Sequence, residues 1–252
     1  MTYEYIRTEL IDGVFTLQMH RPDALNALMP AMLAEMIEAL NGADANDDVS
    51  VIVLEGAGRA FSAGVDLKIL SGTEPKAGRV GDVFDEPAAE IMGAIRNASK
   101  PVIGKVHGAC FTGALELALH CDFVHTTQDT KFGDTHAKFA IRPTWGMSQT
   151  LVQAVGLRMA KELSYTARTI SGAEAAQLGI ANQAHDDNET LDAAVAKLAR
   201  QIASNDGATI AAYKDLHRIA ETHDVPAGIK AEAVAEYPDI TDTLNRIGGF
   251  LK

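Results

Sequence analysis

The stretch KPVIGKVHGACFTGALELALHCD, residues 100–122, decides the fold of this chain. Residues 101–108 form an apolar run that is too short for a helix, so they are predicted to form a buried strand. Gly108 and Gly113 are predicted to form a turn after this strand, and an apolar pattern of helical period follows them. Glu116 lies within that pattern, although a buried carboxylate destabilises a fold unless it is hydrogen-bonded or protonated. This glutamate therefore needs either a structural partner or a chemical role.

The segment before this stretch repeats the same design. Residues 49–56 are predicted to form another buried strand, and a turn with three glycines follows it before a helix start near Val65–Asp66. Residues 84–98, between the two strands, have a helical pattern. This alternation predicts an α/β fold in which crossover helices connect strands that are at least partly parallel.

The N-terminal third is predicted to add a hairpin and a helix. Residues 3–20 read as two strands joined by a tight turn at Asp12–Gly13, and residues 29–40 read as a helix with Pro30 in its first turn. The Gly-rich, polar segment 71–82 is predicted to be a surface loop that can act as a lid.

From about residue 145 onward the pattern is mainly helical. Ser171 and Glu174 have the spacing of a capping box for a short helix that ends at Gly179. Two Ala-rich helices are predicted over 187–205 and 207–222, and they are expected either to cover the core or to form subunit contacts.

The composition excludes several classes of partner. The 252-residue chain has a net charge of -12, whereas nucleic acids and anionic membranes are bound mostly by clustered Lys and Arg. Cys110 and Cys121 lack the spacing of a CxxC motif, and no HExxH pattern is present, so no metal or redox cofactor is expected. Neither a basic leader nor a membrane-spanning stretch is apparent, and a cytoplasmic protein is expected.

The two glycine turns point to a site for an oxygen that becomes negative. Each turn precedes a predicted helix, whose first N–H groups have no partner within the helix. Two such amides that converge would form an oxyanion hole.

Two alternative functions of the first glycine turn have weaker support. Phe61 occupies the place where a dinucleotide-binding turn needs a third small residue, and Ser62 lacks the first glycine of a GxSxG nucleophile elbow.

Several segments together resemble the crotonase, or enoyl-CoA hydratase/isomerase, superfamily. They are RPDALNAL (21–28), GAGRAFSAGVDLK (56–68), residues 100–122, FGDTHAKFAIRP (132–143) and the later AAQLGIAN. The resemblance implies a spiral of ββα units over residues 1–195 and a helical region over 196–252 that builds a homotrimer or a dimer of trimers. It also implies an acyl-CoA thioester as substrate.

The resemblance implies a role for particular residues. The oxyanion hole would use the backbone N–H groups of Ala63 and Gly113, and Glu116 would match one of the two catalytic glutamates of hydratases. His136 stands where FGxPE segments carry the second glutamate, and an imidazole can exchange protons near neutral pH. Asp134 is a less favoured substitute. The positions expected to contact substrate or CoA are Arg21, Ala24, Ala60, Asp66, Leu67, Lys68 and Trp145.

The expected reaction is hydration of a 2-enoyl-CoA, or the reverse dehydration of a 3-hydroxyacyl-CoA. An alternative within the same class is double-bond isomerisation or other enolate chemistry, which needs only one base. An alternative from a different class is a catalytically weak acyl-CoA-binding member of the family. A serine hydrolase would depend on Ser62 alone.

Overall fold

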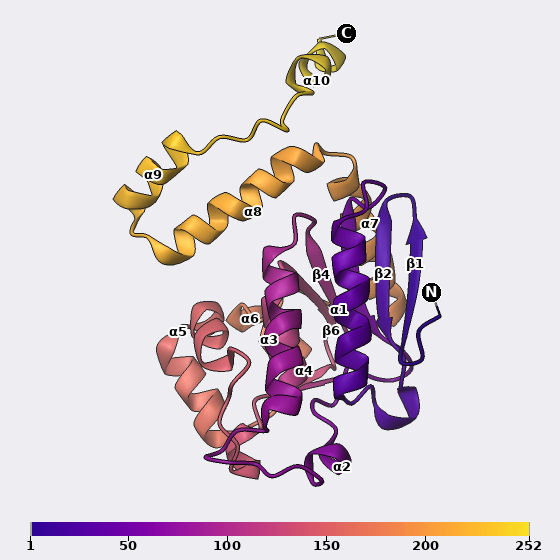
Figure 1. Ribbon diagram of the computed structural model, residues 1–252, viewed down its shortest axis with the longest axis vertical. Coiled ribbons are helices and arrows are strands. Elements are labelled where there is room, and N and C mark those ends of the chain that lie inside the picture. The colour runs from indigo at the N-terminus through magenta and orange to yellow at the C-terminus, as the bar shows by residue number, and fades with distance from the viewer. Residues whose placement is uncertain (1, 252) are drawn as a thin grey trace.

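Six strands form the main sheet of the computed structural model, which describes residues 2–251 (Figure 1). Their order is β1-β2-β3-β4-β6-β9. The bounds are Ile6–Ile11 for β1, Val14–Met19 for β2, Val51–Gly56 for β3, Val102–Val106 for β4, Phe123–Thr127 for β6 and Gln183–His185 for β9. β1 and β2 form an antiparallel hairpin, and the remaining neighbours are parallel. The predicted α/β fold with parallel strands is confirmed.

A smaller sheet turns the chain into a spiral. Its order is β5-β7-β8, with bounds Ala109–Phe111, Lys131–Gly133 and Ile170–Ser171. β4 is followed by β5 and then by α4 (Gly113–His120), while β6 is followed by β7 and then by the 3-10 helix η2 (His136–Phe139). In the preceding turn of the spiral, Ser62 forms a bridge to Cys110 at the position that a strand would occupy. Successive ββα units are therefore present, as the sequence predicted.

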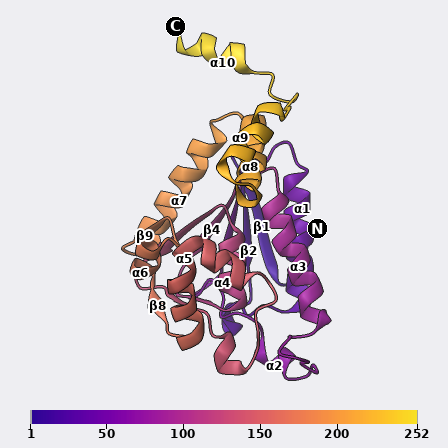
Figure 2. The same ribbon diagram turned by 90° about the vertical axis from the view of Figure 1, so that its left-hand side faces the viewer.

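Helices cover both faces of the main sheet. α1 (Pro30–Asp44) and α3 (Asp82–Asn97) lie on one face and α7 (Asn188–Ala203) lies on the other (Figure 2). Ile52 of β3 faces the first helical layer, whereas Val51 packs with Leu191 and Val195 of α7. Because side chains alternate between the two faces of a strand, every residue of β3 is buried.

The expected division between residues 195 and 196 falls within α7. Ala199 lies beyond that division and is still fully buried against the sheet, so α7 belongs to the core as one helix. The helices that leave the core are α8 (Gly207–Thr222), α9 (Val225–Val234) and α10 (Thr243–Phe250). Figure 1 shows α9 and α10 extending away from the sheet.

Four further helical elements complete the fold, and among them only α2 lines the cavity described below. They are η1 (Pro22–Ala24), α2 (Leu67–Leu70), α5 (Met147–Thr166) and α6 (Gly172–Leu178). α6 has half of the predicted capping box, because Ser171 accepts from the N–H of Glu174 while the Glu174 carboxylate binds Arg168. Residues 71–81 connect α2 to α3 as a loop, as predicted. Within residues 2–251, no helix is both long and apolar enough to cross a membrane.

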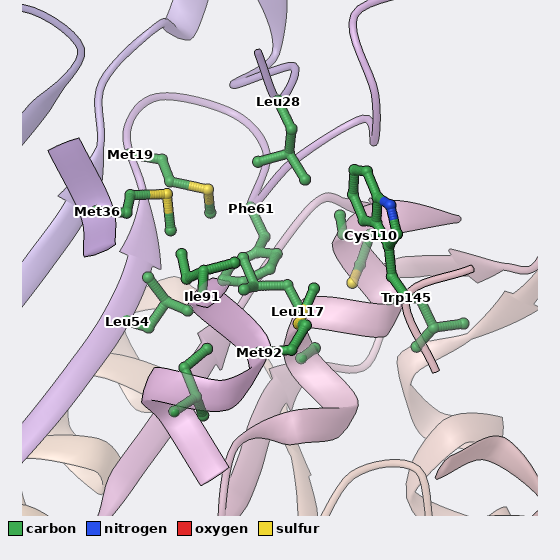
Figure 3. Packing of buried hydrophobic residues seen from close by; sticks show 14 of the residues in the cluster. Met19, Leu28, Met36, Leu54, Phe61, Ile91, Met92, Cys110, Leu117 and Trp145 are labelled. Carbon is green, nitrogen blue, oxygen red and sulfur yellow. The ribbon is translucent and has the colours of Figure 1, made fainter. Parts of the chain in front are cut away.

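The core beside α1 and α3 ends at a tryptophan. Leu54, Phe61, Ile91 and Leu117 pack together in this core, and Trp145 lies at one side of the same cluster (Figure 3). The other side of Trp145 lines a cavity. The core therefore forms a rigid support behind one cavity wall.

Candidate active site

A cavity of about 370 Å³ opens beside the first turns of α2 and α4. Most of its wall is apolar, with contributions from Val65, Leu70, Phe111, Ile141 and Trp145. Glu116 and His136 are among the few ionisable groups in the wall. A largely apolar pocket with a few convergent polar groups is the usual form of a small-molecule site.

Glu116 is the most deeply buried ionisable group of this wall, with 1% of its surface exposed. α4 carries it in the turn that follows Gly113, where it projects from an otherwise apolar helix. Its Oε1 accepts hydrogen bonds from the backbone N–H groups of Trp145, at 3.2 Å, and Met147, at 3.0 Å. Burial raises the pKa of Glu116 to about 7, although the charge of His136 and the two N–H donors oppose the rise. Near neutral pH this carboxyl can therefore either accept or donate a proton.

His136 connects Glu116 to a second carboxylate. Its Nε2 lies 3.6 Å from Glu116 Oε2, and its Nδ1 lies 2.7 Å from Asp134 Oδ1. Burial raises the pKa of Asp134, but hydrogen bonds from His136 and Ser164 outweigh this effect and the net pKa is lowered. Asp134 is therefore ionised and fixes the proton of His136 on Nδ1. Nε2 is left facing Glu116.

The structure replaces one of the two predicted oxyanion-hole amides. The N–H of Ala63 donates to the carbonyl of Leu25 at 2.9 Å, so it is not available to a ligand. Nothing in residues 2–251 accepts from the N–H of Val65 or from that of Gly113, and both residues line the cavity. Val65 is held by a parallel bridge to Leu28 that uses the N–H groups of Leu28 and Asp66 but leaves that of Val65 unused. In the described residues the unbonded N–H groups of the two turns at the cavity are therefore those of Val65 and Gly113, whereas the sequence predicted Ala63 and Gly113.

Two glycines allow the two loops to approach each other. Gly64 has a φ of +92°, and a Cβ at this position would lie 2.6 Å from the carbonyl oxygen of Phe111 and 3.7 Å from the nitrogen of Gly113. A Cβ at Gly113 would lie 2.5 Å from the Trp145 ring. Neither position accepts a side chain without displacing the backbone or the indole.

Thr112, directly before Gly113, has an unusual backbone conformation for a threonine, with φ 50° and ψ -110°. Its N–H donates to the carbonyl of Gly133, and its hydroxyl contacts that of Thr135. These contacts hold the turn that brings the N–H of Gly113 to the cavity. Backbone strain of this kind is typical of functional sites.

The predicted site residues divide into two groups. The cavity brings together Ala63, Leu67, Gly113, Glu116, His136 and Trp145. Arg21, Ala24, Ala60, Asp66 and Lys68 do not line it. Arg21 and Asp66 form an ion pair at 3.0 Å, and Asp66 also caps α2 by accepting from the N–H groups of Lys68 and Ile69. Ala60 is buried, and its carbonyl accepts from the side chain of Asn26.

Ser62 has a structural role. Its hydroxyl is fully buried, donates to the carbonyl of Asn26 and accepts from the N–H of Gly64. It does not line the cavity. The serine-hydrolase alternative therefore loses the only residue that supported it.

Sequence reasoning missed Val65 and the buried Asp85. The Asp85 carboxylate accepts a hydrogen bond from the indole of Trp145. The predicted helix start near Val65–Asp66 was a signal for Val65, because the first N–H groups of a helix are the unpaired ones. No sequence signal marks Asp85, since its contacts with Thr144 and Trp145 come from a segment distant along the chain.

Comparisons with known proteins show which sequences and structures this chain resembles. A family model described as "Enoyl-CoA hydratase/isomerase" matches residues 9–243. "Probable enoyl-CoA hydratase 1, peroxisomal" from Arabidopsis thaliana is 36% identical over 76% of this chain and 68% of its own length. "Delta(3,5)-Delta(2,4)-dienoyl-CoA isomerase, peroxisomal" from the same plant is also 36% identical, over 80% of this chain and 76% of its own. A crystal structure of an enoyl-CoA hydratase from Bacillus anthracis superimposes with a TM-score of 0.89 at 28% identity, covering 98% of this chain and 96% of that one.

Proposed function

This chain belongs to the enoyl-CoA hydratase/isomerase family, and we propose on that premise that it adds water to the C2–C3 double bond of a 2-enoyl-CoA, or removes water in the reverse direction. One observation carries the proposal. A carboxyl with a pKa of about 7 lies 3.6 Å from an imidazole, in a cavity that two backbone N–H groups also line. Such a cavity can hold a thioester and move protons at its α and β carbons.

In this mechanism the N–H groups of Val65 and Gly113 bind the thioester oxygen. When water attacks C3, negative charge moves onto that oxygen and an enolate forms. Fixed N–H donors stabilise the charged oxygen more strongly than the neutral carbonyl. Loss of one such donor typically lowers the rate on the order of 10²- to 10³-fold.

Glu116 acts as the base and His136 as the acid. Ionised Glu116 takes one proton from the attacking water while the water oxygen bonds to C3, and protonated His136 donates its Nε2 proton to C2. The product then carries OH on C3 and a new hydrogen on C2, which leaves Glu116 protonated and His136 neutral. Asp134 is ionised and accepts from Nδ1, so it stabilises the imidazole whenever both of its nitrogens carry a proton.

Glu116 and His136 can return to their starting protonation states without proton exchange with bulk water. The 3.6 Å between Glu116 Oε2 and His136 Nε2 allows a proton to return through a small approach of the two groups or through one bridging water. Both residues are nine-tenths or more buried, so this exchange is shielded from solvent.

A second candidate is isomerisation of an enoyl-CoA double bond. Among the described residues that line the cavity, Glu116 is the single carboxylate. Isomerisation needs only one group that removes a proton from one carbon and returns it to another. Incubation with a 3-enoyl-CoA in deuterated water separates the two reactions, because isomerisation yields the 2-enoyl-CoA and hydration does not consume this substrate directly.

The decisive test is the absorbance of the conjugated thioester with 2-enoyl-CoAs of increasing chain length. We expect the wild-type protein to lower this absorbance, and Glu116→Gln to lower it on the order of 10²- to 10⁴-fold more slowly. Glu90→Gln, at an exposed position of α3, is the matched control. A saturated acyl-CoA should bind wild type and Glu116→Gln with similar affinity. Binding without turnover in the wild type would identify a non-catalytic acyl-CoA binder instead.

A further inference from the structure

Asp85 is a buried carboxylate outside the cavity that binds side chains from two separate segments. It lies in the first turn of α3, with 8% of its surface exposed. Its Oδ1 accepts from the Thr144 hydroxyl at 2.7 Å and from the indole Nε1 of Trp145 at 3.0 Å. Its Oδ2 accepts from Arg79 Nε, in the loop before α3, at 3.0 Å.

Trp145 connects Asp85 to Glu116, because it donates a hydrogen bond to each of the two carboxylates. All three of its hydrogen-bonding groups are bound to side chains: Nε1 to Asp85, the backbone N–H to Glu116 and the backbone carbonyl to His120, at 3.0 Å. Its ring packs against Gly113, whose missing side chain leaves room for it. A shift of Trp145 would therefore move a hydrogen-bond donor of Glu116 and the cavity wall beside Gly113 together.

The charge of Asp85 suits this role. Arg79 holds one carboxylate oxygen, so the other oxygen is turned toward the two donors on Thr144 and Trp145. Asparagine has only one oxygen, so its NH₂ group would face either Arg79 or these two donors, and donors repel one another. In either orientation the negative charge is lost, so Asp85→Asn weakens or breaks the hydrogen bonds from Thr144 and Trp145 without a change of size.

We propose that Asp85 is a positioning residue for the reaction proposed above. It fixes Thr144 and Trp145 so that the Trp145 N–H stays on the Glu116 carboxylate and the indole stays against Gly113. The inference rests on the proposed function for its effect on turnover, but its structural part can be measured without turnover.

The test compares Asp85→Asn with Asp82→Asn. Asp82 is an acidic residue of the same helical turn that also binds Arg79, at 2.9 Å, but it is exposed and does not contact Trp145. Trp145 is the single tryptophan of the chain, so a ¹⁵N spectrum contains one indole resonance. We expect Asp85→Asn to move this resonance and to speed its exchange with solvent, and we expect Asp82→Asn to leave it in place.

The second measurement is the pH profile of kcat/KM. A weakened Trp145 N–H bond destabilises ionised Glu116, so the acid limb should move to higher pH in Asp85→Asn. His136 and Asp134 are the titratable groups whose charges act on Glu116, and both are unchanged in this variant. Below the midpoint of the wild-type acid limb we expect kcat/KM to fall by up to about 10²-fold, the scale of a roughly 1 Å misplacement in an active site. Asp82→Asn should stay within about twofold, as expected of surface substitutions.

Several outcomes would overturn the proposal. If the indole resonance and the acid limb both stay in place while kcat/KM falls, Asp85 has only a general structural role. Thr144→Val, which removes only the hydroxyl donor, provides the same readouts if Asp85→Asn does not fold, and an unmoved indole signal there counts equally against the proposal. If the wild type has no hydratase activity, the proposed function fails separately. A ¹³C titration of the Glu116 carboxyl in both proteins then decides whether Asp85 still controls it.

Discussion

Glu116 sets how the site responds to pH. With a pKa of about 7, it is protonated at lower pH and cannot accept a proton from water, so kcat/KM should rise with pH through this value. The charge of His136 lowers the Glu116 pKa, and His136→Gln removes that charge. We expect a lower kcat/KM and an acid limb moved to higher pH, measured with an enoyl-CoA from pH 5 to 9. His223→Gln, at the exposed end of α8, should leave the profile unchanged. An acid limb that stays fixed in His136→Gln would show that the two groups are not coupled.

Gly113 is a residue of the cavity wall at which a single methyl group should lower turnover. A Cβ there meets the Trp145 ring at 2.5 Å, so either the indole or the amide must move. We expect Gly113→Ala to lower kcat/KM on the order of 10²-fold, comparable to the loss of an oxyanion donor. Gly42→Ala in α1 is the control, because nothing lies within 4 Å of its added Cβ. Equal activity of the two variants would argue against a role for the Gly113 amide.

At this scale the sequence could identify the right turns but not the right amide. Gly113 and Glu116 follow from the strand-turn-helix pattern and from the family resemblance. The family resemblance assigns Ala63 by position, and nothing in a glycine-rich turn reveals that the Ala63 N–H is bonded to Leu25, a residue 38 positions earlier. The link from Asp134 through His136 to Glu116 likewise depends on how β7 and α4 pack.

Among the elements, α2 depends most on one residue. Asp66 caps this single-turn helix and binds Arg21. We expect Asp66→Ala to lower the free energy of unfolding by about 1 kcal/mol through the lost cap. The corresponding fall in Tm is about 2 to 4 °C, measurable by calorimetry. Lys68→Ala, exposed on the same helix, keeps the cap and should keep the Tm. An unchanged Tm in Asp66→Ala, combined with weaker binding of acyl-CoA, would instead favour the substrate contact first expected for Asp66.

The long elements were predictable and the short strands were not. β3 and β4 are continuous apolar runs that are too short for a helix, whereas α1 and α3 have apolar residues at helical period, and the structure confirms all four. β5, β7 and β8 have only two or three residues, too few for a period to appear. Their pairing into a second sheet is imposed by the spiral, which brings the start of each turn beside the previous one.

The whole molecule exposes an unusual amount of apolar surface at its C-terminal end. Val225, Val234, Leu244 and Leu251 are each at least three-quarters exposed, and they lie on or beside α9 and α10. Large apolar side chains that are exposed on helices outside the core are candidates for an interface. We propose that these helices pack against further copies of the chain, in the homotrimer or dimer of trimers that the family resemblance implies.

This assembly predicts a mass three or six times 26.8 kDa in analytical ultracentrifugation. Val234→Asp combined with Leu244→Asp should shift the protein to monomer, because a charge on each apolar face must lose its hydration to enter an interface. The circular dichroism of the core should stay the same, since both side chains are exposed in the single chain. A wild-type protein that sediments as a monomer at all concentrations would refute the assembly.

The left-handed backbone of Thr112 has a consequence for anyone who evolves this protein in the laboratory. Glycine adopts such a conformation without penalty, whereas a side chain there costs about 1 to 3 kcal/mol. A library screened for heat tolerance alone should therefore enrich Thr112→Gly. The Thr112→Gly variant would lose the hydroxyl contact to Thr135, and the peptide that presents the Gly113 amide would be held less firmly. Selection for thermal stability should therefore favour glycine at position 112, whereas selection for turnover should favour threonine.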